Sequence, residues 1–306
     1  GKKFIMCHGE YIETNKHMKR LVLIDSNALI HRSFHALPPL TTKKGELVNA
    51  VYGFTAVLLR VLKELKPDYI VATFDLPKPT FRHREYKAYK STRPKTPEEL
   101  SQQFSKVKEV IKAFDIPIFE KEGFEADDII GTIVKKTGKD IEDIVVTGDL
   151  DTLQLVDENT KVYTLKKGIT DTVIYDEKAV DERYGLKPEQ LVDFKGLKGD
   201  PSDNIPGVPG IGEKTAIKLL QQFGSLEDIY KEIQNPKSKI QDPLKARLLE
   251  NKAQAIFSKK LATIRYDVPI KFNLKDCETE TYDKQQVIKL FQELDFKSLI
   301  NRLPER

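Results

Sequence analysis

The chain has 306 residues, of which 39% are apolar and 32% charged, so it can form a sizeable core and is not a wholly disordered polymer. Lys and Arg number 51 against 47 Asp and Glu, and a net charge of +4 excludes a bulk polycation. Two distant cysteines argue against a disulfide framework and a cysteine-rich zinc site. No secretory signal or membrane-spanning run is visible, so we expect a cytoplasmic protein with no membrane association.

The first 19 residues show no clear hydrophobic period, and we interpret them as a leader or a cloning remnant, with a native start near Met18. After them, short apolar runs alternate with helical patterns. Buried strands are predicted at residues 21–24, 69–74 and 144–147, helices at 48–65, 97–114 and 126–136, and a hairpin of edge strands at 161–166 and 172–175.

This alternation predicts an α/β fold with a central, mostly parallel sheet flanked by helices. Residues beyond about 176 follow a mainly helical pattern. We therefore expect an α/β core over residues 20–180 and a helical part over residues 181–306.

Acidic residues follow three of the predicted strands, and the carboxyl ends of parallel strands meet at one edge of a sheet. A second acidic group opens the predicted helix at 126–136, and two more acids flank a later loop. The full set is Asp25, Asp75, Glu125, Asp127, Asp128, Asp149, Asp151, Asp200 and Asp203. One such acid is often only a helix cap or a turn residue, but the whole set is hard to explain in that way.

Converging carboxylates need cations, because two unit charges about 4 Å apart repel by about 4 kcal/mol even at an effective dielectric constant near 20. A site built from carboxylates alone suits Mg²⁺ or Mn²⁺ better than Zn²⁺. So many acids suggest two ions, as in phosphoryl-transfer sites, where an activated water can replace a protein nucleophile.

A basic segment, residues 78–95, separates two of the acidic groups. It holds seven Lys and Arg against one Glu, with aromatic residues between them. Cations that meet phosphates and rings that stack on bases are typical of single-strand binding, although a solvated surface helix is the simpler alternative. Lys90 and Arg93 are the candidates for stabilising the charge that develops on a reacting phosphate.

A glycine-rich stretch precedes a predicted helix, with Gly207, Gly210 and Gly212 followed by Lys214 and Thr215. Glycines let the backbone approach a phosphate, and a helix N-terminus offers free N–H groups. The spacing is that of a helix–hairpin–helix, not of a Walker A loop, and it predicts sequence-independent binding to duplex backbone. A plain helix–helix turn is the alternative.

Taken together, these stretches resemble the 5′→3′ exonuclease domain of bacterial DNA polymerases I, in the flap endonuclease family. The matching motifs run in family order over about residues 20–303 and include Phe74-Asp75, Glu125–Asp128, Thr147–Asp151, Gly199–Asn204 and Gly207–Ala216. The family often has Gly after the first Asp, where this chain has Ser26.

The resemblance implies a PIN-like fold and a structure-specific 5′ nuclease that cleaves 5′ flaps and the 5′ ends of nicked or branched duplexes, in primer removal and repair. The nine acids would ligate two Mg²⁺, with Mn²⁺ able to substitute. Lys90 and Arg93 would lie at the base of a helical arch, about residues 77–100. DNA would contact Arg32, Phe34, Arg82 and Tyr89, and the helix–hairpin–helix, about residues 188–223, would grip duplex and bind K⁺.

Two alternatives remain open from the residues. One is a non-catalytic module that grips branched DNA, which the retention of all nine acids and Lys90 disfavours. The other is a PIN-type ribonuclease, a class that usually lacks the glycine-rich hairpin; RNA primers are also compatible substrates of the 5′ nuclease. We expect a monomer that either acts alone or is joined to a polymerase.

Overall fold

The computed structural model describes residues 3–7, 10–14, 18–279 and 282–304. Its main sheet has the strand order β5-β4-β3-β6-β7-β8. The strands are β3 Lys19–Asp25, β4 Tyr69–Phe74, β5 Ile118–Glu120, β6 Ile141–Thr147, β7 Thr160–Lys167 and β8 Asp171–Tyr175. All neighbours are parallel except the β7–β8 pair, so the expected mostly parallel sheet with an antiparallel edge hairpin is confirmed. The three-residue β5 was not predicted.

Helices cover both faces of the sheet, which explains why its central strands are continuously apolar. Successive side chains of a strand point to opposite faces. In β3, Val22 and Ile24 belong to one apolar core, and Leu21 and Leu23 belong to the other. All four side chains are buried, so β3 anchors the layers on both sides.

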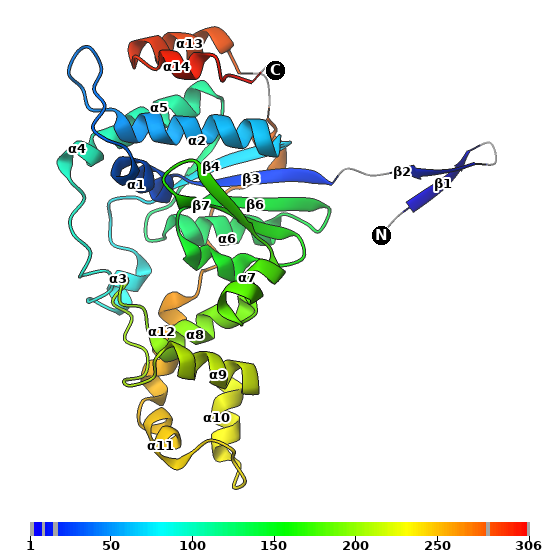
Figure 1. The fold of residues 1–306 in the computed structure, drawn as a ribbon, viewed down its shortest axis with the longest axis vertical. Helices are drawn as coiled ribbons and strands as arrows, with labels where there is room; N and C mark the ends of the chain where they lie inside the picture. The colour runs from blue at the N-terminus through cyan, green and yellow to red at the C-terminus, as the bar shows by residue number, and fades with distance from the viewer. Residues whose placement is uncertain (1–2, 8–9, 15–17, 280–281, 305–306) are drawn as a thin grey trace.

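The first core is covered by helices from both ends of the chain (Figure 1). These are α1 Ser26–Ala36, α2 Asn49–Leu65, α4 Glu98–Ser101, α5 Gln103–Ala113, α13 Lys284–Glu293 and α14 Lys297–Ile300. The single helix predicted at 97–114 is therefore divided near Gln102. The C-terminal pair α13 and α14 packs here and not with the helices that precede it, so the predicted helical part does not form one continuous unit.

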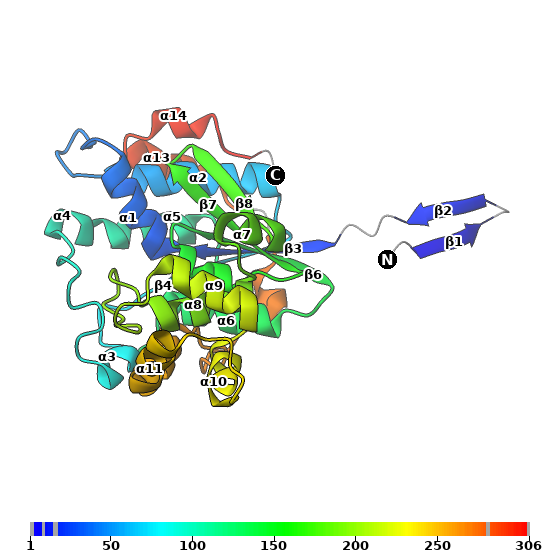
Figure 2. The ribbon, with the colours of Figure 1, turned by 60° about the horizontal axis from the view of Figure 1, so that its bottom comes forward.

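The second core joins the other face of the sheet to the remaining helices, of which the first lies against the sheet and the later ones extend away from it in Figures 1 and 2. They are α6 Ala126–Lys136, α7 Glu177–Tyr184, α8 Leu191–Lys198, α9 Glu213–Phe223, α10 Leu226–Gln234, α11 Asp242–Glu250 and α12 Lys252–Ala262, with 3₁₀ turns η1 Leu150–Leu155, η2 Pro188–Gln190 and η3 Leu274–Cys277. Because sheet residues and α9 residues share this core, the boundary expected near residue 180 does not separate two cores.

Two further segments lie outside these layers. The strands β1 Lys3–Cys7 and β2 Glu10–Thr14 pair only with each other, although no strand was expected in this region. The basic segment contains the short helix α3 Phe81–Glu85 and then turns and loop up to α4. The expected helical arch over residues 77–100 is thus mostly non-helical. Within the described residues, no helix is both long and apolar enough to cross a membrane.

Candidate active site

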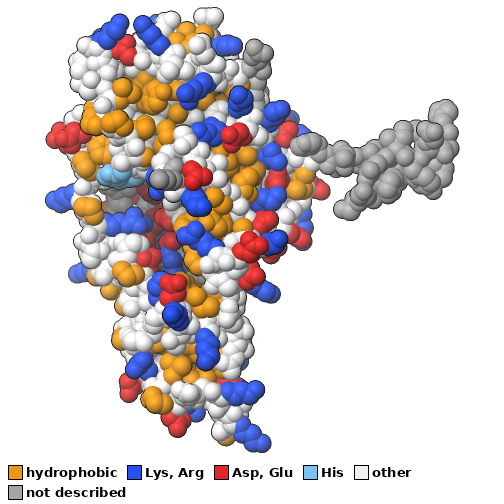
Figure 3. All heavy atoms as spheres, viewed as in Figure 1, with side chains coloured by type: hydrophobic (Ala, Val, Ile, Leu, Met, Phe, Trp, Pro, Cys, Tyr) orange, Lys and Arg blue, Asp and Glu red, His pale blue; other side chains and the backbone are white. Residues whose placement is uncertain are grey.

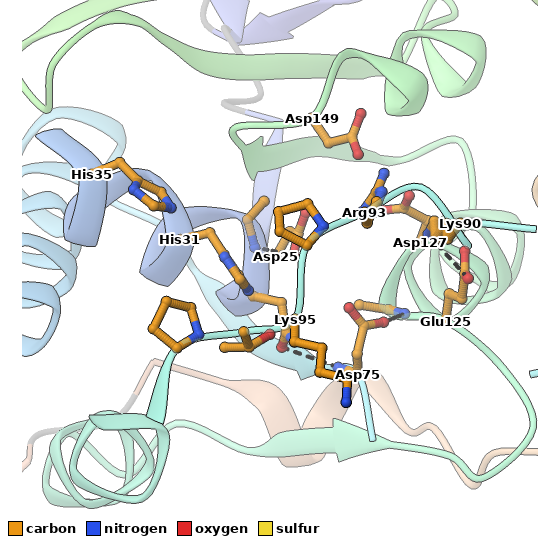
Figure 4. A pocket seen from close by; sticks show the side chains of 16 residues that line it. Asp25, His31, His35, Asp75, Lys90, Arg93, Lys95, Glu125, Asp127 and Asp149 are labelled. Carbon is orange, nitrogen blue, oxygen red and sulfur yellow. Dashed lines mark hydrogen bonds and ion pairs between the residues drawn. The ribbon is translucent and has the colours of Figure 1, made fainter. Parts of the chain in front are cut away.

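A cavity of about 420 Å³ opens where β3, β4 and β6 end. Figure 3 shows acidic side chains in a hollow of this face beside a histidine, and Figure 4 shows the cavity from close by. Five of the nine predicted metal ligands line it: Asp25, Asp75, Glu125, Asp127 and Asp149. The parallel sheet therefore brings together carboxylates that are up to 124 positions apart in the sequence.

The cavity carboxylates are fixed by the backbone around them. Asp25 ends β3 and caps α1 by accepting a hydrogen bond from the Ala28 amide (3.0 Å), and it also accepts one from Thr147 Oγ1 (2.6 Å). Asp75 follows β4 and accepts a hydrogen bond from the amide of Ala126 at the start of α6 (2.7 Å). Asp25 therefore both caps a helix and lines the cavity, so the two interpretations of an acid at a strand end do not exclude each other.

The electrostatics of the cavity favour bound cations. Burial, with the nearby charge of Asp75, raises the pKa of Asp25 to about 7. Loss of solvent, with the charges of Asp25 and Asp149, raises the pKa of Asp127 well above its usual value. Among the described residues, none of Asp25, Asp127 and Asp149 forms an ion pair with Lys or Arg. A divalent cation would supply the missing charge, and the oxygen-only donor set fits Mg²⁺ or Mn²⁺.

Three other predicted ligands form a separate group, which we call the three-acid cluster: Asp151, Asp200 and Asp203. Each offers a carboxylate oxygen, and these oxygens lie within 4.8 Å of one another. Unlike Asp25, Asp127 and Asp149 of the cavity, all three are paired with basic side chains. Lys195 forms ion pairs with Asp151 and with Asp200 (2.6 Å to the latter), and Arg93 pairs with Asp203.

The ninth acid, Asp128, is not placed to bind a metal ion, which corrects the prediction from sequence. It is fully buried, and both carboxylate oxygens accept hydrogen bonds from the Arg82 guanidinium at 2.8 Å. The amides of Glu125 and Arg265 also donate to it. Asp128 lies at the third position of α6, one residue beyond Asp127, so its side chain leaves the helix in a different direction.

Arg82 and Tyr89 are buried as well, each 3% exposed, which corrects their expected role as DNA contacts. Arg82 also donates to the Leu261 and Thr263 carbonyls (2.8 and 2.9 Å). The Tyr89 hydroxyl donates to Glu125 and Asp203 (3.2 and 3.1 Å). Both side chains therefore position the acids and the loop; the alternating aromatic and basic residues of this segment do not form an exposed stacking surface.

Lys90 and Arg93 line the cavity, as Figure 4 shows. Lys90 Nζ lies 3.1 Å from Glu125 and 3.8 Å from Asp203. Its backbone has a φ of 55°, and its amide donates to the Asp203 carbonyl (2.9 Å). Asn204 supports the same turn, because its amide group donates to the Ala88 carbonyl (2.8 Å). The loop that carries Lys90 is thus fastened to the loop that carries Asp203.

The other predicted DNA contacts near the cavity have structural partners. Arg32 donates to the carbonyls of Leu165 and Lys166 (3.2 and 2.8 Å) and so holds the end of β7. Phe34 is half-buried against the first core. Neither lines the cavity.

The glycine-rich stretch joins α8 to α9, as expected for a helix–hairpin–helix. Gly207, one of the predicted DNA contacts, is buried within it at a φ of 62°, and its amide donates to Ser258 Oγ (3.0 Å), so this N–H is not available to a phosphate. The Gly210 carbonyl accepts from Arg247 (3.1 Å). Gly212 caps α9 and is exposed, as is Lys214, while Thr215 is half-buried.

The structure adds cavity residues that the sequence did not single out. His31 and His35 both line the cavity from α1, opposite several of the acids (Figure 4). Burial, with the charge of His35, lowers the pKa of His31. The two lie four residues apart in α1, so helical spacing places them on one face, but no helix was predicted there from the sequence. Asn27 and Lys95 also line the cavity, without a comparable signal.

Two family descriptions match the sequence. Residues 20–185 match the 5′-3′ exonuclease, N-terminal resolvase-like domain, and residues 186–285 match the 5′-3′ exonuclease, C-terminal SAM fold. Among solved structures, T5 5′-exonuclease with bound divalent metal ions (zinc) is 21% identical, with a TM-score of 0.64 over 91% of this chain and 99% of that one. T5 D15 flap endonuclease, in a complex with DNA and metal ions, is 20% identical, with a TM-score of 0.65 over 93% and 98%. At this identity both show a common fold.

Curated relatives are closer in sequence. DNA polymerase I of Bacillus subtilis (strain 168) is 48% identical over 288 residues, which are 94% of this chain and 32% of the relative. DNA polymerase I of Bacillus caldotenax is 47% identical over 286 residues, 93% of this chain and 32% of the relative. The chain thus spans about a third of the length of these relatives. With both family descriptions matched in order, the chain belongs to the 5′-3′ exonuclease family.

Proposed function

We propose that this chain is a divalent-metal-dependent, structure-specific 5′ nuclease, a 5′→3′ exonuclease and flap endonuclease that hydrolyses DNA phosphodiesters. The observation that carries the proposal is the cavity at the sheet edge, where five carboxylates meet beside Lys90 and Arg93. The family supports the reaction class, and the carboxylate-only donor set supports Mg²⁺, with Mn²⁺ able to substitute.

We assign the metal-ligating acids to two separate cation sites. Asp25, Asp75, Glu125, Asp127 and Asp149 would hold one cation in the cavity, and the three-acid cluster would hold a second. When bound, the cations would supply an activated water and neutralise charge on the reacting phosphate. Asp128 has no part in this assignment, because Arg82 occupies both of its oxygens.

The protein's own cations complete the reaction site. A phosphodiester that enters the cavity meets Lys90, whose ammonium lies 3.1 Å from Glu125, and the partly exposed Arg93. Charge that develops on the phosphate oxygens would be stabilised by these two groups. Tyr89 and Asn204 keep the Lys90 turn in place through their hydrogen bonds to Asp203, Glu125 and Ala88, so reaction geometry depends on residues that need not touch DNA.

The helix–hairpin–helix would grip the downstream duplex through phosphates. Gly212 is the N-cap of α9, and both Gly212 and Lys214 are exposed. The backbone amides of a helix N-terminus and a nearby ammonium together suit an anion. Thr215 and the Gly210 turn belong to the same surface, and the hairpin would also bind K⁺. Some solved structures of this fold are complexes with DNA, among them the T5 D15 flap endonuclease and the catalytic core of Rad2, which supports DNA as the substrate.

The biological setting is part of the proposal. The chain would act in the cytoplasm as a monomer on nicked, branched or flapped DNA, in the removal of primers and in repair. In its curated relatives the corresponding region is part of a DNA polymerase I, so a polymerase portion is the expected companion.

Cleavage of a 5′-labelled single-flap DNA tests the proposal, with wild type and Asp149→Ala, in Mg²⁺ and in EDTA. We expect the wild type to release a short oligonucleotide near the junction only in Mg²⁺, and the variant to lose this activity. Lys218→Ala, on the exposed face of α9, is the control variant and is purified and assayed in the same way. Flap binding without cleavage in Mg²⁺ or Mn²⁺ would instead favour a non-catalytic DNA-binding module.

A further inference from the structure

Lys195 occupies an unusual place in the three-acid cluster. It projects from α8 and forms ion pairs with both Asp151 and Asp200, with 2.6 Å to Asp200 Oδ2. Its side chain is only 17% exposed. A lysine ammonium is a compact point charge with three donors, so it satisfies the same carboxylate oxygens that a small divalent cation would need. In the cavity, Lys90 pairs with Glu125 (3.1 Å), but no lysine pairs with Asp25, Asp127 or Asp149 in the described part of the chain.

We propose that Lys195 is the resident counter-ion of the three-acid cluster and competes there with the divalent cation. A cation would enter only when the Lys195 ammonium moves off Asp151 and Asp200. This inference rests on the proposed function, because it concerns the second cation of that reaction. It predicts unequal sites: a cavity cation can bind Asp25, Asp127 and Asp149 without displacing an ammonium, whereas the cluster binds a cation with a penalty that the chain itself imposes.

Charge balance supports this competition. Two carboxylates bridged by one ammonium carry a net charge of −1, whereas without it they carry −2. The attraction of a divalent cation grows with that charge, and a cation that coexisted with Lys195 would be repelled at close range. The long, flexible side chain of lysine allows the ammonium to leave without movement of α8. The third acid, Asp203, is paired with Arg93.

The competing interpretation is that Lys195 is a permanent brace that holds Asp151 and Asp200 in position. A brace and a competitor predict opposite effects on metal affinity. Removing a brace lets the two carboxylates separate and weakens cation binding. Removing a competitor frees their oxygens and strengthens it.

Titration of the metal-free protein with Mn²⁺, followed by electron paramagnetic resonance of the free ion, distinguishes the two. In the wild type we expect one tighter and one weaker site. Lys195→Met, which keeps the length and removes the charge, should tighten the weaker site by about tenfold or more. Lys198→Met is the matched control, because Lys198 lies on the same helix and pairs with Glu213 (3.0 Å) outside the cluster; it should leave both sites unchanged.

Two further variants test whether the gain in Mn²⁺ affinity arises at the three-acid cluster. Lys195→Met combined with Asp200→Asn should lose the gained affinity, which places it at the cluster. Lys195→Gln keeps hydrogen-bonding capacity without charge and should also tighten the site, so the test does not depend on the folding of one variant. Weaker or unchanged Mn²⁺ binding at the second site in both Lys195 variants would overturn the competition. Absence of any Mn²⁺ binding in the wild type would overturn the proposed function as well, so the two failures are distinguishable.

A second readout is thermal stability, compared without and with Mn²⁺. In EDTA, loss of Lys195 leaves two carboxylates facing each other, so Lys195→Met should unfold at a lower temperature than the wild type. The same excess of Mn²⁺ should then raise its melting temperature by more than it raises that of the wild type, since the stabilisation by a ligand that binds the folded state grows with the logarithm of its concentration divided by Kd. An equal rise in both proteins would contradict the proposal.

Discussion

The cavity acids and the three-acid cluster contain the same residue types at one edge of the sheet, yet they are neutralised differently. In the cavity, burial and neighbouring charge raise the pKa of Asp25 to about 7. In the cluster, burial and the charge of Asp149 raise the pKa of Asp151 to about 6 although Lys195 opposes them, whereas at Asp200 Lys195 and Ser202 outweigh burial and lower the pKa to about 2. Acid identity alone therefore does not define a metal site; the source of the opposing charge does.

Asp128 extends this comparison to a third case. Its carboxylate is completely enclosed, and the Arg82 guanidinium serves as a built-in cation that burial prevents from leaving. The three cases form a series, from Asp25, Asp127 and Asp149 without a paired Lys or Arg among the described residues, through a lysine that we propose is displaceable, to a fixed arginine. Asp127 and Asp128 are thus neighbours in the sequence, yet the first has no paired Lys or Arg among the described residues and the second has a fixed arginine.

The largest expected effect comes from breaking the fixed pair. Arg82→Met leaves Asp128 buried without its partner, and loss of one member of a buried pair typically costs about 3–5 kcal/mol. Urea denaturation should show a loss of this size. Arg84→Met, on the exposed face of the same short helix, should change stability by less than about 0.5 kcal/mol. A loss below about 1 kcal/mol in Arg82→Met would mean that Asp128 is not held as the contacts indicate.

The next effect concerns the cavity itself. Lys90→Ala removes an ammonium placed to stabilise developing charge, and loss of one such donor typically lowers kcat by about 10²–10³. Single-turnover cleavage and DNA binding, measured separately, should show a fall in turnover with little change in affinity. Lys87→Ala, exposed on the same loop, is the control. Equal losses of turnover and affinity would make Lys90 a binding residue instead.

A smaller effect should appear as pH-dependent stability when divalent cations are removed. The raised pKa of Asp25 means that the folded state holds a proton which the unfolded chain releases near pH 4. The resulting stability is complete below about pH 4 and is lost as pH rises through 7. Melting temperatures in EDTA should therefore fall from pH 5 to 8, and Mg²⁺ should remove much of this fall.

A control for that measurement is an acid near the other end of the strands, away from the cavity. Asp143, the third residue of β6, is buried, and burial with the charge of Asp157 raises its pKa to about 8. Its contribution also disappears as pH rises, but far from the cavity, so Mg²⁺ should not affect it. Asp143→Asn removes this background. If the remaining fall were identical with and without Mg²⁺, Asp25 would not be part of a cation site.

Much of this arrangement could be predicted from the sequence because it depends on local patterns. Apolar runs that end in Asp25, Asp75 and Asp149 specify strands, and parallel strands bring their ends together. The glycine spacing near Gly210 likewise predicted the α8–α9 connection. Patterns of this kind are contiguous, so one chain segment contains the whole signal.

The features that the sequence did not reveal depend on contacts between residues that are far apart in the chain. The contact of Arg82 with Asp128 joins residues 46 positions apart, and a basic run reads the same whether its arginine is buried or exposed. Lys195 was not singled out because a lysine on a helix is usually solvated. The loop around Lys90 gave no helix because its turn is held by Asn204 and Asp203, a long-range contact that local propensity does not register.

The smallest effect lies outside both acid groups, at the start of α9. Lys214→Ala removes one exposed charge that we expect to neutralise a single phosphate, so DNA binding should weaken modestly, and the slope of log affinity against log salt should decrease by about 1. Lys218→Ala, one turn further along the same helix and also exposed, is the matched control and should leave the slope unchanged. Cleavage at saturating DNA should be unaffected in both variants, because neither lysine approaches the cavity. An equal slope change in the two variants would mean that α9 contributes only diffuse positive charge, whereas no change in either would place the duplex on another face.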